Sequence, residues 1–330
     1  MKPLACLLAL WVLPVSASVA AEGGSQPNVL LLFSADQRAD TLGALGNADI
    51  RTPALDGSRS RARRSRGRNA WVPTTARCVP SRARLLSGRT LFRVNDQLKG
   101  QTTWPEKFAQ AGYTTFLTGK WHNGAESALR SFQRGKAIFL GGMGAPYHLP
   151  LQDIGAPRVF ENQRASREHS VQVFADAAVE FLQEQKGGSP FLCSMAFNGQ
   201  HDSRIAPKEC RTRFDGREPP APGNFLPVHP FNNGEMTVRD EALVPWPRSP
   251  EIVRQHLADY FACIEFMDAQ IARLLAALKA SGQGEKTIVV FASDHGLAIG
   301  SHGLFGKQNL YEHSMRAPLV LAGPGIPPGR

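Results

Sequence analysis

The chain has 330 residues, of which 42% are hydrophobic and 20% are charged, so it is long enough for a large folded core and too apolar for a disordered protein. Its five cysteines are too few and too scattered for a disulfide framework, and no CxxC pair predicts a zinc site. Six arginines within residues 59–68 supply six of the ten net positive charges, so the overall charge does not indicate a nucleic-acid-binding face.

Residues 1–21 have the pattern of a secretory signal peptide. A lysine at position 2 precedes the apolar segment Leu4–Leu13, and small residues follow up to Ala20 and Ala21. The segment is too short to span a membrane, and no later segment approaches that length. We therefore expect a mature chain, 22–330, that is periplasmic or secreted and has no membrane anchor.

The first predicted strand ends in two candidate ligands. Residues 28–34 form a short continuous apolar run, which predicts a buried parallel strand, and Asp36 and Gln37 follow it. Ligands of open α/β sheets bind beyond the carboxyl ends of the strands, so both side chains are candidates for a site. The alternative for Asp36 is a helix N-cap, a common role of aspartate after a strand.

The segment 57–68, GSRSRARRSRGR, fits no regular element, because Ala62 is its only apolar residue with a Cβ. Like charges at this density repel one another and stay solvated, which favours a loop. The segment could also be a polyanion-binding arm, or a stretch garbled by two nearby frameshifts.

Cys78 opens the stretch CVPSRARLLSGR, which ends at Arg89. Pro80 can start a helix, so Cys78 is expected just ahead of a helix N-terminus, where backbone N–H groups favour an anion. Arg82, one turn further, offers a planar set of donors suited to an oxyanion. The alternative is a buried structural cysteine beside a surface arginine.

A short helix is predicted at Trp104–Ala111 and a strand at Tyr113–Leu117. The strand leads into TGKWHNG, in which Lys120 and His122 alternate with Trp121. On an extended backbone these two polar side chains point to one side. The alternative is an exposed lysine next to a capping histidine.

The middle of the chain contains one clear helix. Residues 125–165 show no clear periodicity, and we assign them no chemistry. Apolar residues at helical spacing predict a helix at Glu168–Lys186, followed by a buried strand at Phe191–Phe197 with His201 just past its end. The proline-rich residues 207–250 predict a long surface excursion that could form part of a pocket wall.

The longest helix is predicted at Glu251–Ser281, where apolar residues recur every three or four positions. A strand at Thr287–Ala292 follows and ends at Asp294 and His295. The alternation of helices and strands favours a mostly parallel sheet. Asp294 and Asp36 would share one cation only if their two strands are neighbours.

Together these motifs resemble the signature of the type I sulfatases, a family of the alkaline phosphatase superfamily. The resemblance rests on CVPSR with LLSGR, on GKWH, and on SDHG followed by Lys307. It implies an alkaline-phosphatase-like α/β fold, with helices on both faces of a mostly parallel central sheet. The chain ends at Arg330, so the resemblance covers the family's N-terminal catalytic domain and implies that a C-terminal subdomain is missing.

The resemblance also implies a metal site. Its ligands would be Asp36, Asp294, His295, the residue at position 78 and Gln37, which stands where the family usually has a second acid. A glutamine offers a neutral carbonyl oxygen that can still bind a hard cation, with one charge fewer. The oxygen-rich ligand set favours Ca²⁺ over Mn²⁺ or Mg²⁺.

The nucleophile implied by the resemblance is Cys78, oxidised to formylglycine by a dedicated maturation enzyme. Its hydrated aldehyde would attack the sulfur of a sulfate ester, and His122 would support it or a sulfate oxygen. Arg82 and Lys120 would stabilise charge on the sulfuryl oxygens. His201 or Lys307 would protonate or neutralise the departing oxygen.

These residues imply hydrolysis of a sulfated small molecule or carbohydrate, with no nucleic-acid partner. Two alternatives remain. One is a phosphodiester or phosphonate monoester hydrolase of the same superfamily, since such sites use similar metal ligands. The other is a non-catalytic secreted protein that binds polyanions through Arg59–Arg68.

Overall fold

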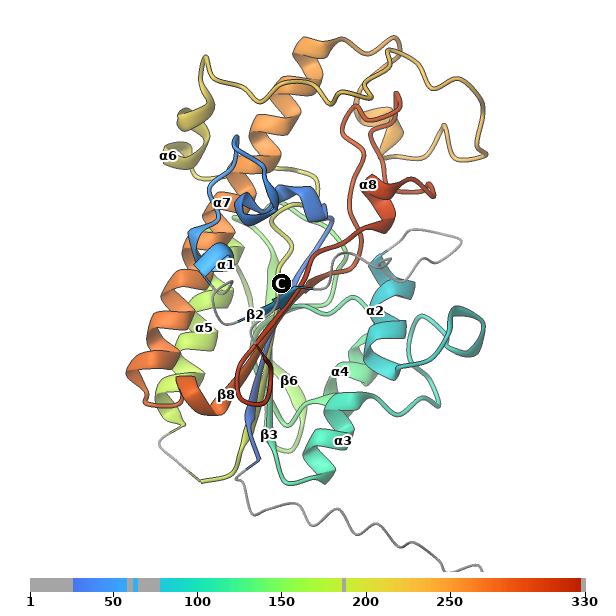
Figure 1. Ribbon diagram of the computed structural model, residues 1–330. Coiled ribbons are helices and arrows are strands. Elements are labelled where there is room, and N and C mark those ends of the chain that lie inside the picture. Colours follow the sequence, from blue (N-terminus) through green and yellow to red (C-terminus); the bar gives the residue numbers. More distant parts are fainter. Residues whose placement is uncertain (1–25, 58–61, 65–77, 186–187, 328–330) are drawn as a thin grey trace, which may run out of the picture.

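The computed structural model of the protein describes residues 26–57, 62–64, 78–185 and 188–327. The predicted signal peptide, residues 1–21, lies outside the described residues. In Figure 1 a central sheet, seen nearly edge-on, separates two groups of helices. This three-layer arrangement confirms the predicted fold class.

The described strands form one nine-stranded sheet in the order β2-β9-β8-β1-β7-β3-β4-β5-β6. The five strands at its centre, from β8 to β4, are parallel, and the two strands at each edge pair antiparallel. The strands are β1 (Asn28–Ser34), β2 (Ala62–Arg64), β3 (Thr114–Lys120), β4 (Arg134–Phe139), β5 (Pro150–Gly155), β6 (Val159–Ala165), β7 (Phe191–Ala196), β8 (Thr287–Ser293) and β9 (Leu319–Ala322).

Two layers of helices flank this sheet. In Figure 1, α1, α5 and α7 lie on one face, and α2, α3 and α4 lie on the other. The α-helices of the described residues are α1 (Pro53–Gly57), α2 (Cys78–Ser87), α3 (Trp104–Gln110), α4 (Ala125–Ser131), α5 (Ser170–Glu184), α6 (Lys208–Arg211), α7 (Pro250–Ala280) and α8 (Glu312–Met315).

The long helix α7 follows from its apolar spacing and its first residues. Ser249 caps it, because the serine side chain accepts a hydrogen bond from the backbone N–H of Ile252, and Pro250 occupies the first turn. Side chains such as Leu257 and Ile264 are buried in the main core. Burying each contributes about 1.5–3 kcal/mol, so Ile264→Asp would disrupt the packing of α7 on α5 and the sheet.

The pairing of β1 with β8 brings the two predicted ligand pairs together. The strands are parallel neighbours, with Ser34 opposite Ser293. β1 is buried along almost its whole length, which explains its continuous apolar run. Because both strands end at the same edge of the sheet, Asp36 and Asp294 are adjacent although 258 positions separate them.

Residues 125–165, for which the sequence predicts no element, contain four: α4, β4, β5 and β6. α4 has only seven residues, too few for a clear helical repeat. β6 is almost entirely exposed, so it lacks the apolar alternation of a half-buried strand. Within the arginine-rich segment, Ala62–Arg64 form the edge strand β2 against β9, and the remainder from 58 onward lies outside the described residues.

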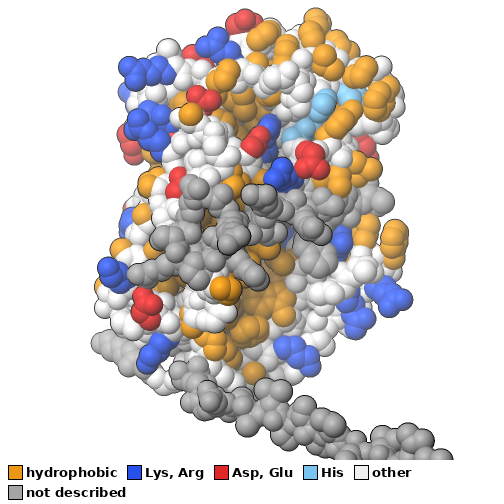
Figure 2. Space-filling model, in the orientation of Figure 1, with side chains coloured by type: hydrophobic (Ala, Val, Ile, Leu, Met, Phe, Trp, Pro, Cys, Tyr) orange, Lys and Arg blue, Asp and Glu red, His pale blue; other side chains and the backbone are white. Residues whose placement is uncertain are grey.

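The edge of the sheet near β9 is less covered than its centre. Apolar residues of β8 and β9 such as Ile288, Val290 and Leu321 are only half-buried. Figure 2 shows hydrophobic side chains on the surface in the lower middle of the molecule. In the described ranges, no helix combines the length and apolar character needed to cross a membrane.

Candidate active site

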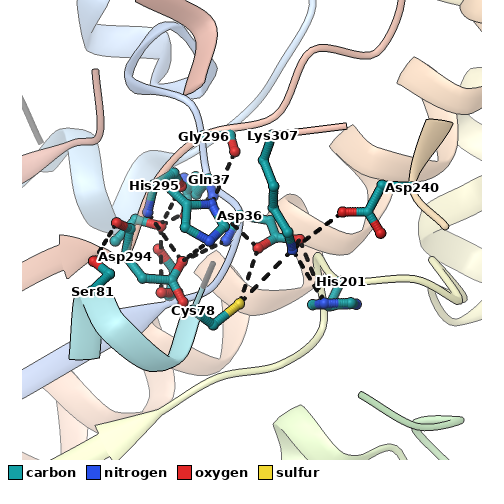
Figure 3. A network of polar contacts seen from close by, with 12 residues as sticks. Asp36, Gln37, Cys78, Ser81, His201, Asp240, Asp294, His295, Gly296 and Lys307 are labelled. Atoms are coloured by element: carbon teal, nitrogen blue, oxygen red, sulfur yellow. Dashed lines mark hydrogen bonds and ion pairs between the residues drawn. The ribbon is translucent and has the colours of Figure 1, made fainter. Parts of the chain in front are cut away.

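Four buried side chains converge at the carboxyl ends of the parallel strands. Asp36 follows β1, Asp294 and His295 follow β8, and Cys78 begins α2. One potential ligand atom from each lies within 4.8 Å of the others. Figure 3 shows these residues pointing toward one another from separate elements. The structure therefore brings together residues that the sequence analysis assigned to one metal site.

The turn after β1 is fixed by hydrogen bonds to β8 and α7. The backbone N–H of Asp36 donates to Asp294 Oδ1 at 2.9 Å, and that of Gln37 donates to Ser293 Oγ at 3.0 Å. The Tyr260 hydroxyl donates to the carbonyl oxygen of Asp36 at 2.6 Å. Asp36 itself has φ 58, a left-handed conformation that aspartate tolerates better than most residues. Its carboxylate is thus held toward α2.

Cys78 is the first residue of α2, slightly inside the helix rather than ahead of it as predicted. Ser81 anchors this helix, because its hydroxyl donates to the carbonyl oxygen of Asp294 at 2.7 Å. Cys78 Sγ lies 3.7 Å from Asp36 Oδ1. Burial opposes ionisation, but the ammonium groups of Lys120 and Lys307 outweigh it and hold the pKa of the Cys78 thiol well below its usual value. The site therefore favours an anion at position 78.

Lys307 lies between the metal-site carboxylate and a histidine. Its Nζ is 2.7 Å from Asp36 Oδ2 and 3.2 Å from His201 Nε2. Burial alone would raise the pKa of Asp36, but Lys307 and His201 lower it to about 2. His201 lies just past β7, as predicted. His201 and Lys307, the residues expected at the leaving group, therefore lie beside Asp36, a residue expected at the metal.

Arg82 and Lys120 occupy the other side of Cys78. An Arg82 nitrogen, Nη1, donates to the carbonyl oxygen of Lys120 at 2.9 Å, and Nε lies 3.4 Å from Asp294 Oδ2. The Lys120 side chain is fully buried, and its Nζ makes no hydrogen bond with the described residues. Burial lowers the pKa of Lys120, and the nearby Cys78 opposes that shift. Both cations are available to a bound oxyanion.

His122 reaches the site by a different backbone path from the one predicted. β3 ends at Lys120, and His122 has φ 71, so the two residues do not alternate on one extended strand. The ring nevertheless lies near Cys78: burial lowers the pKa of His122, and the charge of Cys78 opposes that shift. Gly142 leaves room for the ring, because a Cβ there would lie 2.3 Å from His122 Cε1. A side chain at position 142 would displace His122.

Several buried polar atoms at the site lack a hydrogen-bond partner among the described residues. They include Gln37 Oε1, Asp294 Oδ2 and His295 Nε2. Such atoms are rare in proteins unless a ligand or water satisfies them. Gln37 Nε2 donates to Thr41 Oγ1 at 3.2 Å, which leaves its oxygen free. The donor set therefore fits a divalent cation.

The charges of the site also suit a cation. Burial would lower the pKa of His295, but the carboxylates of Asp294 and Asp36 outweigh burial and raise it to about 9. His295 Nδ1 lies 3.1 Å from the carbonyl oxygen of Gly296, which favours a proton on Nδ1 and leaves Nε2 to face a ligand. Cation binding would thus compete with protonation of this ring.

A further carboxylate at the site, Asp240, lies in the proline-rich excursion and was not predicted. Asp240 is buried, and its Oδ2 lies 3.9 Å from Lys307 Nζ. No periodicity or motif marks this position. His302, which the sequence analysis did not assign to the site, stacks on Tyr311 with a centroid distance of 4.1 Å and contacts Asn224. Figure 2 shows histidine side chains beside hydrophobic ones on the upper right surface.

Comparisons with known proteins agree with the geometry. Iduronate 2-sulfatase of Mus musculus is 26% identical over 354 residues, which cover 94% of this chain and 62% of that protein. Arylsulfatase of Clostridium perfringens is 27% identical over 343 residues, covering 91% of this chain and 69% of that protein. The chain thus spans about two thirds of the length of these relatives.

The fold has close counterparts among solved structures. One is a protein in complex with its substrate, D-glucosamine-2-N,6-O-disulfate, with a TM-score of 0.76 and 23% identity, covering 91% of this chain and 72% of that one. A family model described as Sulfatase matches residues 27–330, nearly all of the chain. The chain therefore belongs to the sulfatase family.

Proposed function

We propose that the protein hydrolyses sulfate monoesters to an alcohol and inorganic sulfate. The observation that carries this proposal is the position of Cys78, at a helix start, between buried metal-type ligands and a group of buried cations. The relatives named iduronate 2-sulfatase and arylsulfatase support the same reaction. Sulfate esters are anionic, so a buried cationic site is a suitable environment for them.

The residues that would hold the cation are Asp36, Gln37, Asp294 and His295, with the side chain at position 78 completing the ligand set. The carboxylate and amide oxygens favour a hard cation, Ca²⁺ before Mn²⁺ or Mg²⁺. A cation bound there would offset the charge of the sulfate and act as a Lewis acid. Gln37 contributes no charge, so this site carries one negative charge fewer than a site with two adjacent acids.

The nucleophile would derive from Cys78. Oxidation of its CH₂SH group to an aldehyde would give formylglycine, whose hydrate supplies a hydroxyl for attack on sulfur. The site's own residues prepare this position. Lys120 and Arg82 offer donors for the nucleophile and the sulfuryl oxygens, and the ring of His122 would orient the hydroxyl group.

The leaving group would face His201 and Lys307. The Lys307 ammonium and the His201 ring lie 3.2 Å apart, so an ester oxygen between them could be neutralised or protonated as the S–O bond breaks. Neutralisation of this oxygen matters most for alcohols of high pKa, such as those of carbohydrates. A sulfated carbohydrate or another small sulfated molecule is therefore the substrate class that we propose.

We further propose a secreted or periplasmic location, which the signal-peptide pattern of residues 1–21 supports, and a maturation enzyme that recognises the CVPSR stretch. Intact-peptide mass spectrometry of the protein from its native host tests the modification. Replacement of CH₂SH by an aldehyde has a defined mass signature at residue 78. Finding only the thiol would count against the proposed mechanism.

Parallel assays test the reaction itself. The protein, produced together with a formylglycine-generating enzyme and supplied with Ca²⁺, should hydrolyse aryl sulfates faster than aryl phosphate diesters or phosphonate monoesters. Dominant turnover of the phosphorus esters would overturn the sulfatase assignment. Binding to heparin-like polymers without any turnover, and unaffected by Cys78→Ala, would instead support the polyanion-binding alternative.

A further inference from the structure

A buried ion pair in the excursion fixes the backbone that leads into Lys307. Glu241 accepts hydrogen bonds from the backbone N–H groups of Phe305 and Gly306 at 2.9 and 2.8 Å. Arg248 Nη2 donates to Glu241 Oε2 at 2.7 Å, and Arg248 also donates to the carbonyl oxygen of Gly303. We call this pair, Glu241 with Arg248, the clamp. It ties the excursion to the segment immediately before Lys307.

Asp240, next to the clamp, faces the Lys307 ammonium directly. Its Oδ2 lies 3.9 Å from Lys307 Nζ and accepts a hydrogen bond from Gln308 Nε2 at 3.2 Å. Only 3% of Asp240 is exposed, so water screens this pair little. Figure 3 shows Asp240 and Asp36 on opposite sides of the ammonium group. The ammonium thus lies between two carboxylates.

Arg239 connects this arrangement to the other residue expected at the leaving group. Its Nη2 donates to Asp202 Oδ2 at 2.9 Å and also to Asp240. Asp202 follows His201 in the chain. One guanidinium therefore links the neighbour of His201 to the carboxylate that faces Lys307, so the two leaving-group residues share one polar network.

We propose that Asp240 is a positioning residue for Lys307. Asp36 attracts the ammonium toward the metal ligands, and Asp240 attracts it from the opposite side, so that it stays beside His201, where the departing oxygen would lie. Asp240 itself would not touch the substrate. This inference rests on the proposed sulfate-ester hydrolysis, and it adds a function for the excursion that the motifs of the sequence do not assign.

The first test varies the leaving group. Aryl sulfates of increasing phenol pKa are compared for the wild-type full chain and Asp240→Asn. Because the ammonium acts on the departing oxygen, we expect kcat/KM to fall about 10-fold for the best leaving group and about 100-fold for the poorest. The larger loss reaches the lower end of what acid–base catalysis usually contributes. A uniform loss across the series would indicate only general damage and would overturn the proposal.

The second test asks whether Asp240 acts through Lys307. In a Lys307→Met background, assayed with 4-nitrophenyl sulfate, Asp240→Asn should cause no further loss of kcat/KM. Losses that simply multiply in the double variant would contradict the proposal. Asp176→Asn is the matched control. It makes the same chemical change at a surface ion pair with Arg273, and it should leave the leaving-group dependence unchanged.

A third measurement does not depend on turnover. Urea denaturation midpoints of the wild type, Asp240→Asn, Lys307→Met and the double variant form a cycle that reports the interaction of the two side chains. We expect the midpoint shifts to be non-additive. If the wild type hydrolyses no sulfate ester, the proposed function fails. If the midpoints are additive, the positioning of Lys307 by Asp240 fails.

Discussion

Two buried ionic clusters in this protein differ in how completely their polar atoms are satisfied. In the clamp, Glu241 and Arg248 bond each other and nearby backbone, and the Arg248 guanidinium lies over the rings of Trp246 and Phe305 at 4.4 and 4.9 Å. At the candidate active site, the described residues leave atoms such as Lys120 Nζ without a partner.

This difference separates a structural cluster from a ligand site. An unsatisfied buried polar group costs about 1–3 kcal/mol, so a folded protein retains several of them together only where another benefit offsets the cost. The clamp stabilises the fold and gains nothing from a ligand. A cation and an oxyanion would stabilise the candidate active site by satisfying its unpaired atoms. Substitutions at the candidate active site should therefore lower activity more than stability. Substitutions in the clamp should lower stability more than activity.

Cys78→Ala should give the largest effect and act mainly on activity. Loss of a nucleophile lowers turnover by about a thousand-fold or more, whereas Cys78 makes only long polar contacts, of 3.7 and 3.8 Å, that contribute little to folding. Aryl sulfate turnover and thermal melting measure the two properties.

The matched control is Cys193→Ala. Cys193 is fully buried within β7, and burial raises the pKa of its thiol, so it is an inert core residue. We expect this variant to retain turnover while losing about 1–2 kcal/mol of stability, because it removes packed volume. Equal turnover by the two variants would remove Cys78 from the mechanism.

Arg248→Leu should give the next largest effect and act mainly on stability. It leaves the Glu241 carboxylate buried without its cation, a change that lowers the free energy of unfolding by about 3–5 kcal/mol. Urea denaturation measures the loss. The double variant Glu241→Met with Arg248→Leu removes both charges and should recover part of it. A single variant as stable as the wild type would show that the clamp is not structural.

The sequence could predict strands that other parts of the fold bury on both faces, and helices whose apolar residues recur at regular spacing. β1 is buried by its neighbours, so its apolar run was visible, and α7 has a regular apolar stripe. β8 is also a continuous apolar run, although several of its residues are only half-buried. Asp36 and Asp294 could be predicted as candidate ligands simply because each follows the end of a predicted strand. Recognising them as one site also required the family resemblance, because nothing local specifies which strands are neighbours.

The sequence could not predict residues whose place depends on distant contacts. Asp240 and Glu241 lie in a stretch without periodicity, and the Glu241 carboxylate is held by backbone groups more than sixty residues away. The left-handed turn at His122 likewise has no local signal, since its ring fits because Gly142 leaves space beside it. Neither hydrophobic periodicity nor amino-acid composition can identify such residues.

Binding of a cation to the candidate active site should change stability by less than Arg248→Leu does. A cation at about 100 times its Kd should stabilise the folded protein by about 2.7 kcal/mol, because it satisfies atoms that lack partners. Thermal melting with Ca²⁺ and with a chelator measures this. Gln37→Leu should reduce the Ca²⁺-dependent shift. Gln172→Leu, the same change on α5, should not, and equal shifts in both would exclude Gln37 as a ligand.

The smallest effect concerns Asp268, a third buried carboxylate. It accepts hydrogen bonds from the backbone N–H groups of Ala54 and Leu55, which fixes the start of α1. Burial raises the pKa of Asp268 from 3.8 to about 6, against those hydrogen bonds. A raised pKa means that the folded state binds the proton more tightly. The resulting stabilisation is complete below pH 3.8 and is lost as the pH rises through about 6.

We therefore expect the wild type to gain about 1 kcal/mol relative to Asp268→Asn when the pH falls from about 7 to about 5, at about 1.4 kcal/mol per pKa unit. Paired urea denaturation curves of the two proteins at both pH values measure this, and the difference between them cancels the titration of all other groups. A constant difference would mean that Asp268 is ionised throughout. Its two backbone hydrogen bonds would then compensate fully for burial.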